Sequence, residues 1–467
     1  MSDQSNITEK MPDLLMNLVD QLRSRLSQRE DSSGTVFERI KRADAALQEL
    51  RYARAEQIYR SVLREHPLHP HAQTNLAIAL SRSGRTAEAV ALLADAVAAH
   101  PDFFDAWFNL AIIRHIRGEL EDAVYAYEQA LCITPASVEV RRNLAMLKLV
   151  RGELTDANWR DFAWRRLCDG FKATQFACAA PLWRGAALDA GSIVVYGEQG
   201  IGDEILYASC YPRLIAAARE TLIACNDRLV PLFRRSFGAA KVFGLSQAPA
   251  WQQAIDAAQA QVPAGDLMRY YWSGKPPDDA GAAYLRANPE AMSRWQERLA
   301  GLGRGFKVGI SWRGGTDRSN RDVRSLETGD LGPLLQESGI HWVSLQYDTN
   351  EAELAAIRAA HGCRLHHWQE AIDDYDQTAA LVASLDLVIS VATSVAHLAG
   401  ALGQTVWVLI NAAPRWCYMH HGVRLPWYGS AQVFRQPRLG DWETPVAECA
   451  VTLRNYARDK AASGGAI

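Results

Sequence analysis

A repeat with a period of 34 residues occupies the N-terminal part of the chain. Its clearest marker is proline, at Pro67, Pro101 and Pro135. The same spacing relates Ala55 to Ala89 and Ala123, and Tyr59 to Leu93 and Tyr127. A fixed period of this length indicates stacked units, each of which buries its apolar face only against its neighbours. The sequence therefore predicts an array of helix pairs in this part of the chain.

The third copy is the most complete and shows how one unit would fold. Small side chains at Ala111, Ala123 and Ala130 would let two antiparallel helices approach closely. Gly118 would turn the chain between them, and Pro135 would end the second helix. The residues of this copy resemble the tetratricopeptide repeat consensus position by position: Trp107, Leu110, Ala111, Gly118, Ala123, Tyr127, Ala130 and Pro135. Such arrays commonly hold an extended peptide or a partner's helix in a groove, so we expect a protein or peptide partner there.

A fourth copy, beginning near Leu144, becomes aromatic and basic over residues 158–167. We expect this segment to be a helix that joins the array to the next domain, so that the repeats extend over residues 37–170. Before them, within residues 1–36, the apolar residues of 11–27 would share one face of a helix, and we expect the rest of this segment to be partly disordered. This helix either caps the first repeat or mediates a homodimer. The sequence leaves both open.

The composition excludes several classes of protein. At 467 residues the chain is too long for one hydrophobic core, which predicts at least two domains. A net charge of −3 gives no concentrated positive field, so neither nucleic acid nor an acidic membrane is expected as a partner. The eight cysteines are scattered without a CxxC pair, which is typical of a reducing compartment without structural zinc. Because the first residues are polar and acidic rather than a signal peptide, we expect a cytoplasmic protein.

The pattern changes at Ser192 from helical to alternating strands and helices. One block of such units is expected within residues 171–285 and a second within 286–459, followed by a short disordered tail at 460–467. The uncharged stretch 387–410 fits a buried strand, a helix and another buried strand better than a membrane span. Two such blocks predict two nucleotide-binding halves that face each other across a cleft, with ligands at the carboxyl ends of the strands.

Two loops at these strand ends carry the first candidate binding residues. In one, Gly200 and Gly202 allow close backbone approach, and Asp203 is either a functional carboxylate or simply a charge at a helix start. In the other, four arginines follow a buried strand: Arg313, Arg318, Arg321 and Arg324. So many cations indicate either a phosphate-bearing ligand or a solvated basic loop.

A third loop leads into a helix in the second block. Thr393 and Ser394 begin this helix, whose free N–H groups favour an anion. His397 lies one turn further and is expected to face the same cleft. A single histidine in such a position is more often a core residue with satisfied hydrogen bonds.

Taken together, these segments resemble bacterial tetratricopeptide-repeat glycosyltransferases. The C-terminal half of that family is related to the ADP-heptose:lipopolysaccharide heptosyltransferases of glycosyltransferase family 9, which have the GT-B fold. The resemblance rests on the segments GEQGIGDEILYASCYPRL, KVGISWRGG, WVSLQYD, DDYDQTAALVASLDLVIS, SVAHLAGALG and LPWYGSAQVFRQ. It extends from residue 37 to residue 445 and implies a helical repeat array followed by two facing Rossmann-like domains.

The resemblance also implies roles for individual residues. Asp203 occupies the turn whose aspartate is the proposed base of heptosyltransferases, which deprotonates the acceptor hydroxyl. The donor's diphosphate and sugar would be held by residues of all three loops and of WVSLQYD: Gly200, Gly202, Trp312, Arg313, Gly314, Arg324, Ser325, Gln346, Thr393, Ser394 and His397. Ala392 replaces the acidic residue that the family has before the threonine, so the sugar contact of that carboxylate is missing.

The reaction expected on this basis is an inverting transfer of a sugar from a nucleotide-diphosphate donor to a hydroxyl acceptor. No Asp-x-Asp pair stands on a suitable loop, since Asp278 and Asp279 lie in a linker and Asp373 and Asp374 at a helix start. Arginines and the helix start would neutralise the leaving diphosphate, so neither a metal nor another cofactor is expected. The nucleotide sugar is the co-substrate, and a protein recruited by the array is the expected acceptor.

Two alternatives stay open. The chain could be an adaptor whose α/β half only binds a nucleotide or has a structural role, an interpretation that the missing acid at Ala392 favours. It could also keep the chemistry and use a glycan or a lipid-linked acceptor. An enzyme is favoured by the glycines, Asp203, the arginine loop and His397. A site that had lost its activity would not require these residues.

Overall fold

The computed structural model describes residues 34–168, 176–188, 191–315 and 321–462. The apolar helix expected within residues 11–27 lies outside these ranges, as does the tail beyond residue 462. Contacts between residues divide the chain into two compact units, Met1–Val140 and Arg141–Ile467. This division falls inside the fourth repeat and earlier than the expected end of the array at residue 170.

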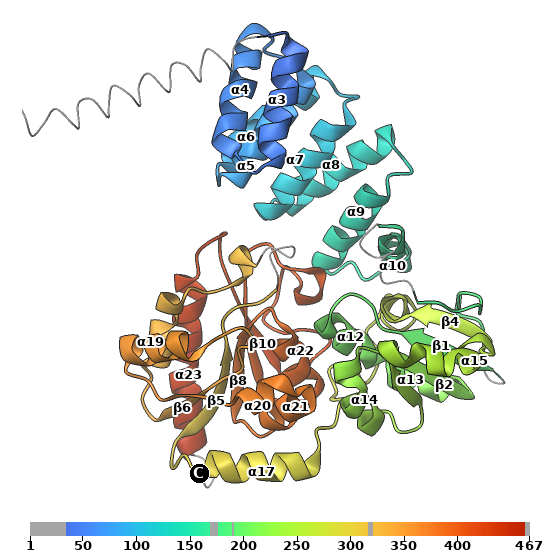
Figure 1. Cartoon of the computed structure of the whole chain (residues 1–467), viewed down its shortest axis with the longest axis vertical. Coiled ribbons are helices and arrows are strands. Elements are labelled where there is room, and N and C mark those ends of the chain that lie inside the picture. Colours follow the sequence, from blue (N-terminus) through green and yellow to red (C-terminus); the bar gives the residue numbers. More distant parts are fainter. Residues whose placement is uncertain (1–33, 169–175, 189–190, 316–320, 463–467) are drawn as a thin grey trace, which may run out of the picture. The chain divides into compact units, whose positions relative to one another are not determined.

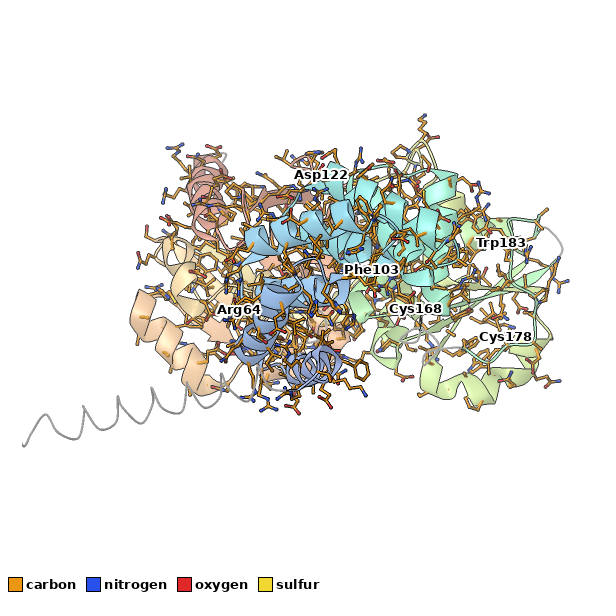
Figure 2. The ribbon with its side chains drawn as sticks, turned by 90° about the horizontal axis from the view of Figure 1, so that it is seen from above. Arg64, Phe103, Asp122, Cys168, Cys178 and Trp183 are labelled. Carbon is orange, nitrogen blue, oxygen red and sulfur yellow. The ribbon has the colours of Figure 1, made fainter. Side chains whose placement is uncertain are left out.

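The first unit consists of helix pairs, as the 34-residue period predicts (Figure 1). Its helices are α3 Val36–Gln48, α4 Tyr52–Glu65, α5 Pro70–Arg82, α6 Thr86–Ala99, α7 Phe104–Ile116 and α8 Leu120–Ile133. Ala55, Ala89 and Ala123 are completely buried, so each permits a close helix contact. Charged side chains such as Arg64 and Asp122 are exposed on the array (Figure 2).

The turn within each helix pair has a left-handed backbone. Gly84, Gly118 and Gly152, spaced by the repeat period, have φ angles of +81°, +79° and +83°. In the first pair the equivalent position is Leu50, with φ of +60°. A side chain with Cβ makes this conformation unfavourable by roughly 1–2 kcal/mol, so the first repeat folds with local strain that the others avoid.

The second unit begins with the last helices of the repeat pattern. These are α9 Val138–Val150, which crosses the division, α10 Asp156–Phe162 and the 3₁₀ helix η1 Ala163–Leu167. The Trp159 ring on α10 packs edge-on against Trp416 of the α/β half, with 5.3 Å between centroids. Arg165 on η1 forms a buried ion pair with Glu198, at 2.5 Å. These contacts explain why the fourth repeat groups with the α/β half instead of with the array.

The first α/β half contains a parallel sheet with the strand order β3-β2-β1-β4. Its strands are β1 Ser192–Tyr196, β2 Glu220–Cys225, β3 Lys241–Gly244 and β4 Ala260–Pro263. The connecting helices are α12 Ile201–Tyr207, α13 Tyr211–Ala217, α14 Val230–Ser236, α15 Gln252–Asp256 and α16 Leu267–Tyr271. Apolar residues on the strands, such as Val194 and Leu222, form a core that is almost completely buried.

The second half contains a parallel sheet with the order β10-β9-β8-β5-β6-β7. Its strands are β5 Phe306–Ser311, β6 Ile340–Ser344, β7 Leu365–His367, β8 Leu387–Val391, β9 Val406–Ile410 and β10 Ala431–Arg435. Its helices are α17 Pro289–Ala300, α18 Gly332–Leu335, α19 Glu351–His361, α20 Gln369–Asp373, α21 Tyr375–Ala383, α22 Ser394–Ala401 and α23 Glu443–Ala462.

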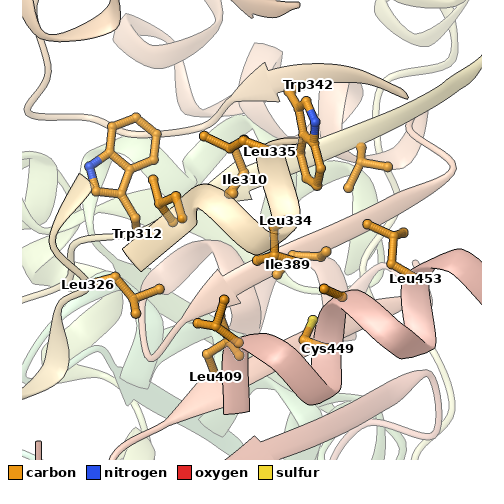
Figure 3. Packing of buried hydrophobic residues seen from close by; sticks show 14 of the residues in the cluster. Ile310, Trp312, Leu326, Leu334, Leu335, Trp342, Ile389, Leu409, Cys449 and Leu453 are labelled. Atoms are coloured by element: carbon orange, nitrogen blue, oxygen red, sulfur yellow. The ribbon is translucent and has the colours of Figure 1, made fainter. Parts of the chain in front are cut away.

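The strands of this second sheet are covered on both faces. Ile389 and Leu409 pack with Leu334 of α18 and Leu453 of α23 in one hydrophobic core (Figure 3). Val388, whose side chain alternates with that of Ile389, is also completely buried. Residues 387–410 thus form strand, helix and strand, which confirms the sequence-based prediction. Within the part of the chain that the structure describes, no helix is long and apolar enough to cross a membrane.

Candidate functional site

The strand order places three loops where ligands bind in open α/β sheets. β1 lies between β2 and β4, and β5 lies between β6 and β8, so each sheet changes its winding direction at its first strand. At such a switch point the loops after neighbouring strands diverge and leave room for a ligand. The loops after β1, β5 and β8 contain most of the predicted site residues.

The loops of the two halves meet where α12 approaches the start of α22. A Cβ atom on Gly202 would lie 3.1 Å from His397 Cδ2 and 3.3 Å from Ser394 Cα. The missing side chain at Gly202 is therefore what allows this contact. Gly200, by contrast, is exposed, and only Asp203 Oδ2 lies near the corresponding position, at 3.7 Å.

Asp203 is buried at this meeting point. Its Oδ2 accepts a hydrogen bond from Gly200 N at 3.4 Å, and its Oδ1 accepts one from Arg415 Nη2 at 2.6 Å. Arg415 comes from the loop after β9, and sequence reasoning missed it because no arginine-rich or glycine-rich pattern surrounds it. The Asp203 carboxylate raises the pKa of Arg415 further above its usual range, so the guanidinium stays charged.

The loop that carries Arg415 is rigidly held. Trp416 is 1% exposed and packs among other aromatic rings. Arg435 on β10 donates to the carbonyl oxygens of Tyr418 and Met419, at 2.7 and 2.8 Å. Met419 has a φ of +53°, and Gln199, in the loop before Asp203, has a φ of +65°. A positive φ costs free energy in residues other than glycine, so it persists only where the surrounding structure holds the backbone in place. Such residues are common at functional sites.

The start of α22 and the arginine loop lie against each other. Thr393 caps the helix, since its hydroxyl accepts from Val395 N at 3.2 Å. Arg324 Nη2 donates to the carbonyl oxygen of Ala392, at 2.5 Å. A Cβ on Gly314 would lie 2.7 Å from Thr393 Cγ2, so this glycine permits the close approach of the two loops.

Ser325 also belongs to this group of predicted residues. Its hydroxyl accepts from Gly314 N at 3.3 Å and donates to the carbonyl oxygen of Arg321 at 2.8 Å. The structure therefore brings together eight predicted residues near Asp203 and α22: Gly200, Gly202, Gly314, Arg324, Ser325, Thr393, Ser394 and His397.

His397 is a buried hydrogen-bonded residue of the second half. Its Nδ1 lies 2.9 Å from the Tyr428 hydroxyl and its Nε2 lies 3.0 Å from the Tyr418 hydroxyl. Burial lowers the pKa of His397 to about 4, so the ring is neutral. Both ring nitrogens are engaged, and the imidazole acts as a support between α22 and the Arg415 loop.

Trp312, Arg313 and Gln346 do not lie at the meeting point of α12 and α22, and their expected donor-binding roles stay predictions. Trp312 is completely buried in the core of the second half (Figure 3). Gln346 is also completely buried, and its side-chain oxygen accepts from Trp312 N and Arg313 N at 3.0 and 2.9 Å. Arg313 is bound by Glu353, with Nη2 at 2.8 Å from Oε2, and by the Asp348 carbonyl. Its charge is already neutralised within this half.

Two buried glutamates beside Asp203 were also missed. Glu198 accepts from Gly265 N at 2.7 Å in addition to its ion pair with Arg165. Glu204 accepts from Asn226 N at 2.9 Å, and burial, with nearby carboxylates, raises its pKa to about 8. Gly197 makes room for Glu204, because a Cβ there would lie 2.2 Å from Glu204 Oε2. The segment GEQGIGDE contains three acidic residues, Glu198, Asp203 and Glu204. A helix cap needs only one of them, so the other two could have been recognised as candidate site residues.

Two cavities lie elsewhere. One of about 520 Å³ lies beside the linker between the halves, and residues lining it include Arg213, Trp272, Tyr284 and Trp427. None of the predicted site residues lines it. The other, of about 880 Å³, lies in the repeat array, and its lining combines apolar residues with charges of both signs: Leu76, Leu80, Leu92, Arg60, Glu88 and Asp95.

The tetratricopeptide repeat model matches residues 40–93 and 74–138. These residues form tetratricopeptide repeats. Over 304 residues the chain is also 30% identical to Protein FlbA of Caulobacter vibrioides. That match covers 61% of this chain and 50% of FlbA, so the chain spans about half the length of this relative.

Solved structures resemble separate parts of the chain. A glycosyl transferase family 9 protein from Veillonella parvula is 12% identical, with a TM-score of 0.42; the match covers 59% of this chain and 98% of that protein. The first tetratricopeptide-repeat domain of Spaghetti (RPAP3), solved with an HSP90 peptide, is 24% identical, with a TM-score of 0.23. That match covers 23% of this chain and 86% of the solved domain.

Proposed function

We propose that the α/β half is a glycosyltransferase that moves a sugar from a nucleotide-diphosphate donor to a hydroxyl group. The observation that carries this proposal is the buried carboxylate of Asp203, which meets Arg415 beside Arg324 and the start of α22. A base, two cations and a helix start are the groups that such a transfer needs. The acceptor is proposed to be a protein that the repeat array recruits.

Each group has a defined part in the proposed reaction. The acceptor oxygen forms a bond to the anomeric carbon while the bond from that carbon to the donor phosphate breaks, which inverts the configuration. Asp203 takes the hydroxyl proton, and the nucleoside diphosphate leaves with the electron pair. Arg324 and the N–H groups at the start of α22 stabilise the charge on this leaving group, so the proposal needs no metal ion.

The chemistry is tested with Asp203→Ala. Nucleotide sugars that bind are first found by thermal shift, and transfer to a co-expressed candidate protein is then followed by intact mass. The variant should lose at least about a hundredfold in transfer rate, since a positioned base contributes that much, while still binding the nucleotide. Unchanged transfer would rule out Asp203 as the base. Transfer that EDTA abolishes and Mn²⁺ restores would contradict metal independence.

A nucleotide-binding module is the second candidate. Ala392 in place of an acidic residue and the fully engaged nitrogens of His397 favour it, because both remove contacts to a donor sugar. Binding of nucleotides without a mass increase on protein, glycan or lipid-linked acceptors would support the module. A mass increase on a glycan or lipid-linked acceptor alone would support the sugar transfer and contradict a protein acceptor.

A further inference from the structure

Arg415 is a partly exposed cation at the contact between the two α/β halves. It joins the loop after β9 in one half to Asp203 on α12 in the other, at 2.6 Å. Its side chain is still 35% exposed. A guanidinium has five N–H donors in a planar fork, and within the described ranges only Asp203 accepts from this one. Most of its donors are therefore available to another acceptor.

The surroundings of Arg415 favour an anion with more than one charge. Arg324 lies against the start of α22 through the Ala392 carbonyl oxygen. The charges of Arg324, Arg415 and Asp203 all act on the buried His397, which places two cations and one carboxylate around the same ring. The excess positive charge and the helix start complement a diphosphate, which arginine binds with two parallel hydrogen bonds.

The same ion pair occupies the carboxylate that has to accept a proton. Arg415 holds Oδ1 of Asp203, and the Gly200 N–H points at Oδ2. A general base must present an oxygen within hydrogen-bond reach of the acceptor hydroxyl. The Asp203 side chain is only 8% exposed, and the Arg415 guanidinium lies on its Oδ1. The carboxylate can accept further hydrogen bonds but offers little open surface, so an acceptor hydroxyl would reach it more freely once Arg415 has moved away.

We propose that Arg415 binds the diphosphate of the donor, and that its ion pair with Asp203 is a latch which the donor opens. This inference rests on the proposed function and adds an order of binding to it. The diphosphate draws the guanidinium away from Asp203, so the base becomes free only when the leaving group is in place. The donor then binds before the acceptor, and Arg415 stabilises the leaving diphosphate.

Binding of nucleoside diphosphates tests the latch in the full-length protein. UDP, GDP, ADP, CDP and dTDP are titrated by calorimetry into the wild type, Asp203→Asn, Arg415→Ala and the double variant. Asp203→Asn keeps the shape and removes the competing charge, so it should tighten binding about tenfold. Arg415→Ala should weaken binding about tenfold, and Asp203→Asn should then bring no gain in the Arg415→Ala background.

The outcomes separate the latch from the proposed function. Equal or weaker binding by Asp203→Asn, with good binding by the wild type, overturns the latch and leaves the donor site intact. Absence of binding of all five diphosphates by the wild type overturns the donor site itself, and the latch with it. If Arg415→Ala fails to fold, Arg415→Lys replaces it, because lysine keeps the charge but lacks the planar set of N–H donors. Adding Asp203→Asn to Arg415→Lys should then increase diphosphate affinity by less than it does in the wild type. An equal gain in the Lys background would contradict a bidentate contact.

Discussion

Glu204 is buried beside Asp203, and the charged residues that act on it are carboxylates. Burial is the main cause that raises its pKa from 4.5 to about 8, and the charges of Asp203, Glu198 and Asp227 act in the same direction. The folded state therefore holds a proton that the unfolded state releases above pH 4.5. This contribution to stability is complete below pH 4.5, falls as the pH rises, and is lost above pH 8.

We predict that Glu204→Gln makes stability less dependent on pH between 5 and 8. The amide stays neutral and can still accept from Asn226 N, so the variant should be more stable than the wild type at pH 8 by on the order of 1 kcal/mol or more. Urea unfolding at pH 5.5 and pH 8 measures the difference. Exposed Glu297→Gln is the control and should leave the pH dependence unchanged. A variant that loses stability equally at both pH values would contradict a protonated Glu204.

At the scale of elements, the contact between α12 and α22 depends on a glycine at position 202. Both atoms nearest to an added Cβ are fixed, because Ser394 Cα is backbone and the His397 ring is held by two tyrosines. Neither can move by the few tenths of an ångström that alanine requires. The halves would have to separate at the point where Asp203 meets Arg415.

Gly202→Ala should therefore reduce the free energy of unfolding by about 1–3 kcal/mol, which is typical of overpacking. Gly200→Ala is the matched control, since its φ of −110° suits any residue and an added Cβ meets only Asp203 Oδ2, at 3.7 Å. It should change stability by less than about 1 kcal/mol. Chemical denaturation of both variants checks the prediction, and equal losses would show that the contact is not tightly packed.

The elements themselves were largely predictable where the sequence is periodic or strongly apolar. The stretch 387–410 was expected as a strand, a helix and a strand, and β8, α22 and β9 confirm this order. No strand was predicted at β3, β4, β7 or β10. β3 and β4 have four residues and β7 has three, which is too few to show a pattern. Each of them pairs with a strand that the sequence pattern does indicate: β3 with β2, β4 with β1, β7 with β6 and β10 with β9.

For the whole molecule, the last repeat is part of the α/β half. Arg165 and Glu198 are 4% and 1% exposed, and removing one partner of such a buried pair usually costs about 3–5 kcal/mol. Trp159 fills a second buried position against Trp416. The α/β half therefore needs residues that precede residue 170, although the sequence pattern suggests that it begins after them.

Truncation tests this division. A chain that begins at Arg141 should unfold cooperatively on heating, because it keeps α10 and η1. A chain that begins at residue 176 loses Trp159 and Arg165 and should be unfolded or strongly destabilised at 25 °C. Circular dichroism and thermal unfolding compare the two. Equal melting temperatures would show that the α/β half is independent of the last repeat.

The sequence by itself determined the repeat period, the turn glycines, the two blocks of parallel strands and the loops that follow them. These features are local, since each depends on residues within one helix pair or one strand and its loop. Tertiary structure decided the rest. It paired Asp203 with Arg415, which lies 212 positions away along the chain, placed Trp312 and Gln346 in the core, and engaged both nitrogens of His397. Which side chains meet depends on how the two sheets pack, and no local pattern encodes that packing.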